Sequence, residues 1–223
     1  MKVKYLIIAI GLLLAACSTG DMKKKEYTAE EADRGLTNTN DQLQVGDIIF
    51  QTSTSTQSQA IQLATNSKYS HVGVLFNINN ELVVLEAVQP VKYTPLIIWI
   101  EKGKGKHFVV KRLKERYLYF NDSTTRLMKA KASAYLNKYY DSYFEWSDDR
   151  MYCSELVWKL YKETLGIELG SLQALKNFDL TSTEVKTKLK ERYGQDIPLA
   201  EQVISPAAIF ESELLEEIKY PVF

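Results

Sequence analysis

The stretch KYSHVGVLFNINNELVVLEAV at residues 68–88 constrains the fold more than any other part of the chain. Two runs rich in β-forming residues flank Asn79 and Asn80, and asparagine tolerates the positive φ angles that tight hairpin turns need. If these two residues form the turn, Ile78 pairs with Glu81, and the register of the hairpin follows. The sequence therefore predicts two antiparallel strands joined by a tight turn.

The predicted register brings a histidine and a glutamate together. Gly73 then faces Glu86, and His71 faces Val88. Facing residues share a sheet face, and so do positions two apart, so His71 and Glu86 become diagonal neighbours. Gly73 has no side chain to block a hydrogen bond between them. Glu86 lies in the apolar run LVVLEAV, where a carboxylate needs a partner or water; the alternative is a strand end that faces solvent.

The second informative stretch reads YCSELVWKLY at residues 152–161 and has a cysteine as its second residue. An amphipathic helix is predicted there, with Asp148 or Asp149 as N-cap, Cys153 in the first turn and Gly166 at the end. Its buried stripe is Cys153, Leu156, Val157, Leu160 and Tyr161. A thiol is a useful nucleophile only as thiolate, a form that a helix N-terminus and a nearby imidazole favour.

These residues form a predicted Cys–His–carboxylate triad. Cys153 is the candidate nucleophile, His71 the candidate base, and Glu86 the residue that orients the imidazole. Backbone N–H groups at the helix start, including that of Cys153, are expected to bind the oxyanion. Tyr152 is a candidate substrate-binding residue through its hydroxyl, with core packing as the alternative.

Two further residues compete for roles in the triad. His107 lies in the charged stretch EKGKGKHF, and we expect it in a solvated loop. Glu155 stands two positions after Cys153, which on a helix is a rotation of about 200°. We therefore expect Glu155 to point away from the thiol and to form a structural ion pair.

The remaining pattern predicts an α+β domain with helices packed against a small, mainly antiparallel sheet. The predicted elements follow in the order strand, helix, several strands, then helices. They are a strand within 43–53, a helix from about 57, a strand at 108–114, a helix at about 123–140 capped by Asp122 or Ser123, a polar helix near 182–193 and a helix beginning at Pro206. Residues 91–106 give no clear pattern.

The N-terminus resembles a bacterial lipoprotein signal. Basic residues precede a short apolar run that ends in LAAC, in which Cys17 is the expected lipidation site. We expect residues 1–16 to be a signal peptide, 17–42 a lipidated polar tether, and 43–223 the functional domain. The protein is then anchored to a bacterial membrane in the cell envelope, on the periplasmic or surface side. Simple secretion or an uncleaved anchor is the alternative.

The chain has only two cysteines and two histidines. If Cys17 carries lipid, Cys153 has no partner for an internal disulfide, and a leftover thiol points to intermolecular pairing or to reactivity. A zinc site of cysteine and histidine is not expected, and no cofactor is predicted. Basic and acidic residues both number 28, so no basic excess points to nucleic acid. We expect a monomer.

Several motifs together resemble a known family. They are GDIIF (46–50), YSHVGV (69–74), LEAV (85–88), YDSYF (140–144), YCSELV (152–157) and ISPAAIFES (204–212). The set is similar to the permuted papain-like amidases, the YiiX/YebB-like relatives of NlpC-type cell-wall cysteine peptidases. The resemblance implies a circularly permuted papain-like fold, in which histidine and carboxylate precede the cysteine. It also implies the roles of nucleophile for Cys153, base for His71 and orienting residue for Glu86.

Three functions are consistent with the sequence. The first is a cysteine hydrolase that cleaves amide bonds in cell-wall peptides or related amino-acid conjugates. The second is an acyl-lipid hydrolase or acyltransferase with the same triad, because an aromatic set could line an apolar groove. That set is Tyr139, Tyr140, Tyr143, Phe144, Trp146 and Tyr152. The third is a non-catalytic binding module in which Cys153 is a buried small hydrophobe.

Overall fold

The computed structural model describes residues 43–219. The predicted signal peptide, the lipidation site Cys17 and the tether lie outside these residues. The described part is an α+β domain, which confirms the predicted fold class. Within residues 43–219, no helix has both the length and the apolar character needed to cross a bilayer.

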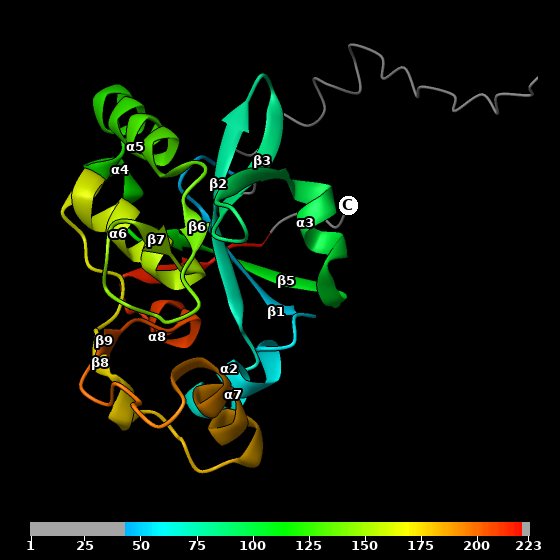
Figure 1. Cartoon of the computed structure of the whole chain (residues 1–223). Coiled ribbons are helices and arrows are strands. Elements are labelled where there is room, and N and C mark those ends of the chain that lie inside the picture. The colour runs from blue at the N-terminus through cyan, green and yellow to red at the C-terminus, as the bar shows by residue number, and fades with distance from the viewer. Residues whose placement is uncertain (1–42, 220–223) are drawn as a thin grey trace, which may run out of the picture. The chain divides into compact units, whose positions relative to one another are not determined.

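The domain is built on a six-stranded sheet in which every neighbouring pair is antiparallel. The spatial order is β10-β5-β1-β2-β3-β4, so β1 and β2 occupy the middle (Figure 1). The strands are β1 (Ile48–Ser53), β2 (His71–Ile78), β3 (Glu81–Glu86), β4 (Lys92–Pro95), β5 (Gly103–Leu113) and β10 (Leu215–Glu217).

The predicted hairpin forms β2 and β3 with the predicted register. Ile78 pairs with Glu81, and Val74 pairs with Leu85. Asn79 and Asn80 have φ angles of 52° and 64°, in the left-handed region that a tight hairpin turn requires. Local turn chemistry therefore fixes which residues of β2 and β3 share a face.

Helices cover both faces of the sheet, and Figure 1 shows α5 and α6 on one side of it and α3 on the other. The helices are α2 (Ser58–Thr65), α3 (Leu96–Glu101), α4 (Arg116–Tyr119), α5 (Asp122–Tyr135), α6 (Cys153–Leu165), α7 (Thr183–Tyr193), α8 (Pro206–Phe210) and the 3₁₀ helix η1 (Leu175–Asn177). Two short ribbons complete the fold, β6 (Tyr139–Tyr140) with β7 (Arg150–Met151) and β8 (Gln173–Ala174) with β9 (Gln202–Val203).

The core divides into three hydrophobic clusters. Alternate residues of the central strands point to opposite faces, so Phe50 joins the cluster under α6, whereas Ile49 joins Trp99 of α3 in a second cluster. The predicted stripe of α6 is buried within the first cluster. A third, smaller cluster joins α2 to α7 through residues such as Ala60 and Leu189.

Two predicted helix caps were wrong. Helix α5 is capped by Asn121 rather than by Asp122 or Ser123, because the Asn121 side chain accepts hydrogen bonds from two backbone N–H groups of the first turn. That helix also ends at Tyr135, before a left-handed residue at Asn137 with φ 67°.

The N-cap of α6 is Tyr152, not Asp148 or Asp149. The reason is that Arg150 and Met151 are extended and pair with β6, so the helix cannot begin earlier. The predicted end is correct, since Gly166 adopts a left-handed φ of 73°. Cys153 is therefore the first residue of the helix.

Candidate active site

The imidazole of His71 and the carboxylate of Glu86 are hydrogen-bonded. His71 Nε2 lies 2.6 Å from Glu86 Oε2, as the hairpin register predicted. Gly73 makes the approach possible, because a Cβ atom placed there would lie 2.8 Å from the carbonyl oxygen of Leu85 and 2.4 Å from a methyl group of Val84. A side chain at position 73 would therefore force apart the two strands that carry the pair.

Glu86 is buried, and further groups hold its carboxylate. The hydroxyl of Thr94 donates to Oε1 at 2.6 Å, and the ammonium of Lys102 lies 4.0 Å from the same oxygen. Burial favours the neutral acid, but the hydrogen bonds and charges of His71, Thr94 and Lys102 outweigh it and lower the pKa of Glu86. The carboxylate is thus ionised at neutral pH and fixed in orientation from both oxygens.

Cys153 lies at the N-terminus of α6, which packs against β2. Its thiol is within hydrogen-bonding reach of the His71 ring. Because Glu86 engages Nε2, the ring nitrogen left for the thiol is Nδ1. The first N–H groups of a helix have no partner within it, so the backbone at Cys153 favours negative charge on the sulfur.

The environment of His71 favours the imidazolium form. Burial opposes the charge, but hydrogen bonds and negative charges from Cys153 and Glu86 outweigh it and raise the pKa of His71 to about 10. The indole of Trp99 stacks on the ring, with centroids 5.8 Å apart and an interplanar angle of 24°. The geometry therefore places the His71 ring between the sulfur of Cys153 on one side and the carboxylate of Glu86 on the other.

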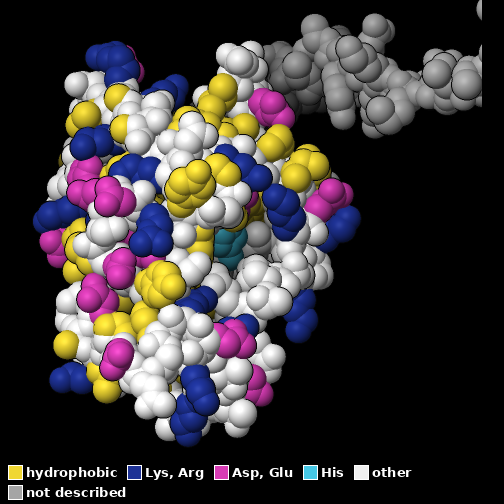
Figure 2. Space-filling model, in the orientation of Figure 1, with side chains coloured by type: hydrophobic (Ala, Val, Ile, Leu, Met, Phe, Trp, Pro, Cys, Tyr) yellow, Lys and Arg dark blue, Asp and Glu magenta, His cyan; other side chains and the backbone are white. Residues whose placement is uncertain are grey.

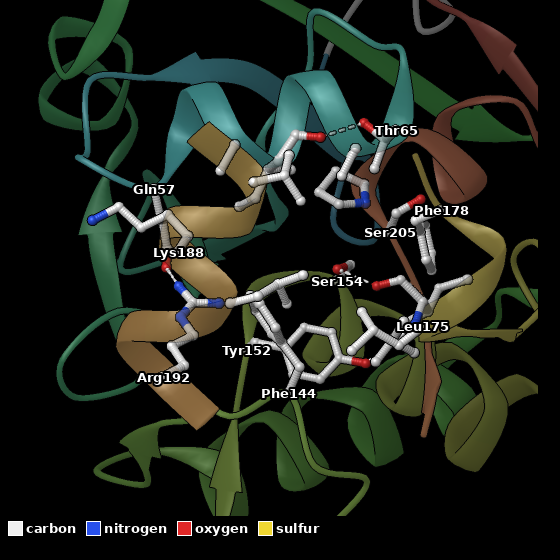
Figure 3. A pocket seen from close by; sticks show the side chains of 18 of the residues that line it. Gln57, Thr65, Phe144, Tyr152, Ser154, Leu175, Phe178, Lys188, Arg192 and Ser205 are labelled. Carbon is white, nitrogen blue, oxygen red and sulfur yellow. Dashed lines mark hydrogen bonds between the residues drawn. The ribbon is translucent and has the colours of Figure 1, made fainter. Parts of the chain in front are cut away.

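An apolar pocket adjoins Cys153, between the start of α6 and the pair α2 and α7. Its empty volume is about 760 Å³, part of which is open to solvent. Figure 3 shows Gln57 and Arg192 at one side of the pocket and Leu175 and Phe178 at the other. Its apolar lining includes Ala60, Ile61, Ala64, Leu175, Phe178, Leu180, Val185, Leu189, Val203, Ile204 and Pro206.

A chain of hydrogen bonds orders the polar side of this pocket. Arg192 donates to the side-chain oxygen of Gln57, and its guanidinium lies 4.4 Å from the ring centre of Phe144. Since arginine can only donate, the amide nitrogen of Gln57 faces Tyr140 and donates to its hydroxyl at 2.7 Å. Burial and the charge of Cys153 raise the pKa of Tyr140, so this hydroxyl keeps its proton. Its oxygen is already an acceptor, which leaves the proton free to be donated.

The structure places the other predicted residues as follows. Tyr152 lines the pocket, but its hydroxyl accepts a hydrogen bond from the backbone N–H of Ile204 at 3.2 Å and its ring packs against Phe144. His107 is exposed, as expected, but it lies within strand β5 and not in the predicted loop. Glu155 forms the expected ion pair, with its carboxylate 2.9 Å from the ammonium of Lys159.

Only half of the predicted aromatic set lines the pocket, namely Tyr140, Phe144 and Tyr152. Tyr139 and Tyr143 are exposed, and Trp146 packs edge-on against the ring of Trp158. Aromatic content alone could not separate these groups, because the segment between β6 and β7 is irregular and has no fixed period.

Sequence reasoning missed Thr94, Gln57 and Arg192. Thr94 lies within residues 91–106, as does Trp99, which stacks on His71 and was also missed. In this segment β4 and α3 form without a readable sequence pattern. Gln57 and Arg192 belong to α2 and α7, and only tertiary packing brings them together. The sequence held no clear signal for Thr94, because β4 and its pairing with β3 appear only in the structure.

Comparison with known proteins agrees with the geometry. Residues 42–219 match the family described as permuted papain-like amidase enzyme, YaeF/YiiX, C92 family. The chain belongs to the permuted papain-like amidases.

Two relatives are close to this chain in sequence. Protein YiiX of Escherichia coli (strain K12), described as uncharacterized, is 50% identical over 184 residues, which are 82% of this chain and 90% of the relative. A crystal structure described as metalloprotein yiiX from Escherichia coli O157:H7 has a TM-score of 0.76 and 49% identity, and the match covers 81% of this chain and 99% of that one. Among residues 43–219, no group of three or more His, Cys, Asp or Glu side chains could hold a metal ion.

The charge state of His71 can be measured directly. In a ¹⁵N NMR titration, we expect the imidazolium to persist well above the ordinary histidine pKa, with a midpoint at about 10. Glu86→Gln should lower this midpoint by at least about one unit, because it removes an adjacent negative charge. A midpoint near ~6.5 in the parent protein would contradict the electrostatic description.

Proposed function

We propose that this member of the family is a cysteine hydrolase that cleaves amide bonds in peptides or other amino-acid conjugates. The observation that carries the proposal is the meeting of Cys153, His71 and Glu86, with Cys153 also lining a pocket. A packed structural cysteine would not need an adjacent imidazole held by a buried carboxylate. We also propose that the protein is related to the NlpC-type cell-wall cysteine peptidases, which is why cell-wall peptides are among the candidate substrates.

The reaction follows from the geometry of the three side chains. The Cys153 thiolate attacks the carbonyl carbon, and a C–S bond forms while the carbonyl π electrons move to oxygen. The oxyanion then collapses and expels the amine, which takes a proton from the imidazolium of His71. Water attacks the resulting thioester, and neutral His71 accepts its proton. The acid leaves, and the thiolate–imidazolium pair is restored.

The oxyanion needs hydrogen-bond donors at the start of α6. The backbone N–H of Cys153 is one, since it has no partner within the helix. The Tyr140 hydroxyl is the second candidate, because Gln57 occupies its acceptor side and leaves its proton available. Tyr152 is a further candidate on the same ground, because the N–H of Ile204 donates to its oxygen and leaves its proton available.

The pocket favours an apolar acyl group on the substrate. Apolar side chains from α2, α7 and η1 dominate its lining, which includes the small residues Ala60 and Ala64. This observation also supports a second candidate function, the hydrolysis or transfer of acyl groups from lipids. An N-acyl amino acid combines both features, with an amide bond and a hydrocarbon chain, and is the best first substrate.

Location completes the proposal. The LAAC sequence supports lipidation of Cys17, which would tether the domain to a bacterial membrane in the cell envelope. A polar linker at residues 18–42 would then let the site reach either wall peptides or membrane-derived acyl conjugates. No cofactor is required by the reaction as written, and monomeric behaviour remains a prediction.

Turnover tests the function. A panel of muropeptides, N-acyl amino acids and ester lipids should give hydrolysis that Cys153→Ser lowers by at least about 10³-fold, because the nucleophile is lost. Thr124→Ser, on the surface of α5, is the matched control and should leave the rate unchanged. No product from any member of the panel in the parent protein would favour a binding module, and equal rates in parent and Cys153→Ser would contradict Cys153 as the nucleophile.

The pocket makes a prediction about chain length. Ala64→Phe should fill part of the pocket and lower kcat/KM at least about tenfold for a long acyl chain, while a short one is hydrolysed as before. Leu63→Phe adds bulk to the same helix outside the pocket and is the control. Equal loss for both chain lengths would show that the acyl group binds elsewhere.

A further inference from the structure

We propose that the domain carries a second membrane contact, a surface around α3 that docks on anionic lipid. This α3 face consists of Ile97 and Ile98 together with Lys92, Lys102, Lys104 and Lys106. It lies outside the pocket and goes beyond the proposed function, because binding to lipid does not require turnover.

The apolar part of the face is an unpaired side of a short helix. Helix α3 buries Leu96, Trp99 and Ile100 against the sheet, whereas Ile97 and Ile98 are 55% and 43% exposed. Single exposed apolar residues are ordinary, but adjoining ones rimmed by polar groups mark interaction sites. The inner residues of α3 already hold the helix against the sheet, so Ile97 and Ile98 are not needed for its packing.

The charged part of the face is almost entirely basic. Lys92 on β4 and Lys102, Lys104 and Lys106 beside α3 are all exposed. Glu101 is the only acid within 91–107, and its carboxylate pairs with the ammonium of Lys106 at 3.6 Å. Four lysines and one glutamate give 4 − 1 = +3, in a chain whose total formal charge is zero. Figure 2 shows hydrophobic and basic side chains adjoining where Figure 1 places α3.

This combination fits a lipid surface better than a soluble polyanion. Lysines attract anionic headgroups, and adjacent apolar side chains can enter the boundary between headgroups and acyl chains. A soluble polyanion would bind through the lysines alone and would leave the two isoleucines exposed to water.

Gly105 and Lys106 adopt left-handed φ angles of 64° and 56°, so the lysine-bearing segment turns at this point.

The position of Leu43, the first residue that the structure describes, supports the same occupant. Leu43 packs against the hydrophobic cluster that contains Leu96, Trp99 and Ile100. The chain therefore enters the domain on the side of the sheet that α3 covers. A lipid on Cys17 and the α3 face would then act together, as two-signal membrane attachment requires.

Docking would place the candidate site at the membrane. Trp99 of α3 stacks on His71, and the ammonium of Lys102 lies 4.0 Å from a carboxylate oxygen of Glu86. The face is thus directly connected to the pair that orients the nucleophile. Acyl conjugates concentrate in the lipid phase, so a docked domain would meet them at high local concentration.

Vesicle sedimentation tests the proposal. The chain from Asn40 onward forms one compact unit that holds all three hydrophobic clusters, so it can be studied without the lipid anchor. We expect it to sediment with phosphatidylcholine vesicles that contain phosphatidylglycerol, and not with phosphatidylcholine alone. Ile97→Ser with Ile98→Ser, and separately Lys92→Gln with Lys104→Gln and Lys106→Gln, should each weaken binding at least about tenfold.

Matched controls separate this surface from general adhesion. Tyr117→Ser with Leu118→Ser alters an exposed apolar pair on α4, 77% and 59% exposed, and should leave binding unchanged. Melting temperatures should confirm that every variant is folded. Unchanged vesicle binding in the isoleucine variant would overturn the proposal. Retention on heparin without vesicle binding would also overturn it, and would assign the lysines to a soluble polyanion.

The same preparations distinguish this inference from the proposed function. Hydrolysis of a dissolved short-chain N-acyl amino acid is measured in parallel, and vesicle binding is repeated with Cys153→Ser. Vesicle binding without hydrolysis in the parent protein would count against the proposed function alone. Hydrolysis without vesicle binding would overturn the α3 face alone.

Discussion

The site depends on the hydrogen bond between His71 Nε2 and Glu86 Oε2. Glu86 is 2% exposed, and a carboxylate buried to that extent is stable only with charged or hydrogen-bonding partners. His71 meets the need and is in turn held as a cation. Burying either charge without the other would cost folding free energy. The elements around the pair must therefore leave the two side chains in contact.

Several features of the sheet serve this pair. The asparagine turn sets the register that places the two side chains diagonally, and Gly73 leaves the strands close enough for contact. Strand β4 supplies Thr94 on the free carboxylate oxygen, and α3 supplies Trp99 over the imidazole. Helix α6 packs on the other face with Cys153 as its first residue, so Nδ1 meets a thiol at a helix N-terminus. The site is thus built from the local geometry of one hairpin and one helix start.

The sequence was sufficient for the parts of the site that depend on local rules. The turn residues and strand alternation predicted the contact between His71 and Glu86, and the apolar stripe predicted residues of α6 that join the main core. Burial on one side alone was wrong for this helix, because residues 153–161 are all buried. Gly166 as the helix end followed from the same kind of rule. Where the rule was local and strong, the predicted residue was correct.

The helix caps, the pocket and its hydrogen bonds depend on tertiary structure, which the periodicity of hydrophobic residues in the sequence does not reveal. The caps of α5 and α6 were misplaced because neighbouring turns and the pairing of β6 with β7 decide where a helix can begin. The pocket arises from α2 and α7, which meet through the small third cluster. The hydrogen bonds from Arg192 through Gln57 to Tyr140 join residues far apart in the chain, so spacing could not indicate them.

The alkylation rate of Cys153 against pH tests the central claim most directly, in the chain from Asn40 onward, where it is the only cysteine. An ion pair with His71 predicts iodoacetamide alkylation that stays fast below about pH 7, and His71→Ala should abolish this low-pH reactivity. A rate that rises only toward ~8.5, as for an ordinary thiol, and is indifferent to His71→Ala would contradict the account.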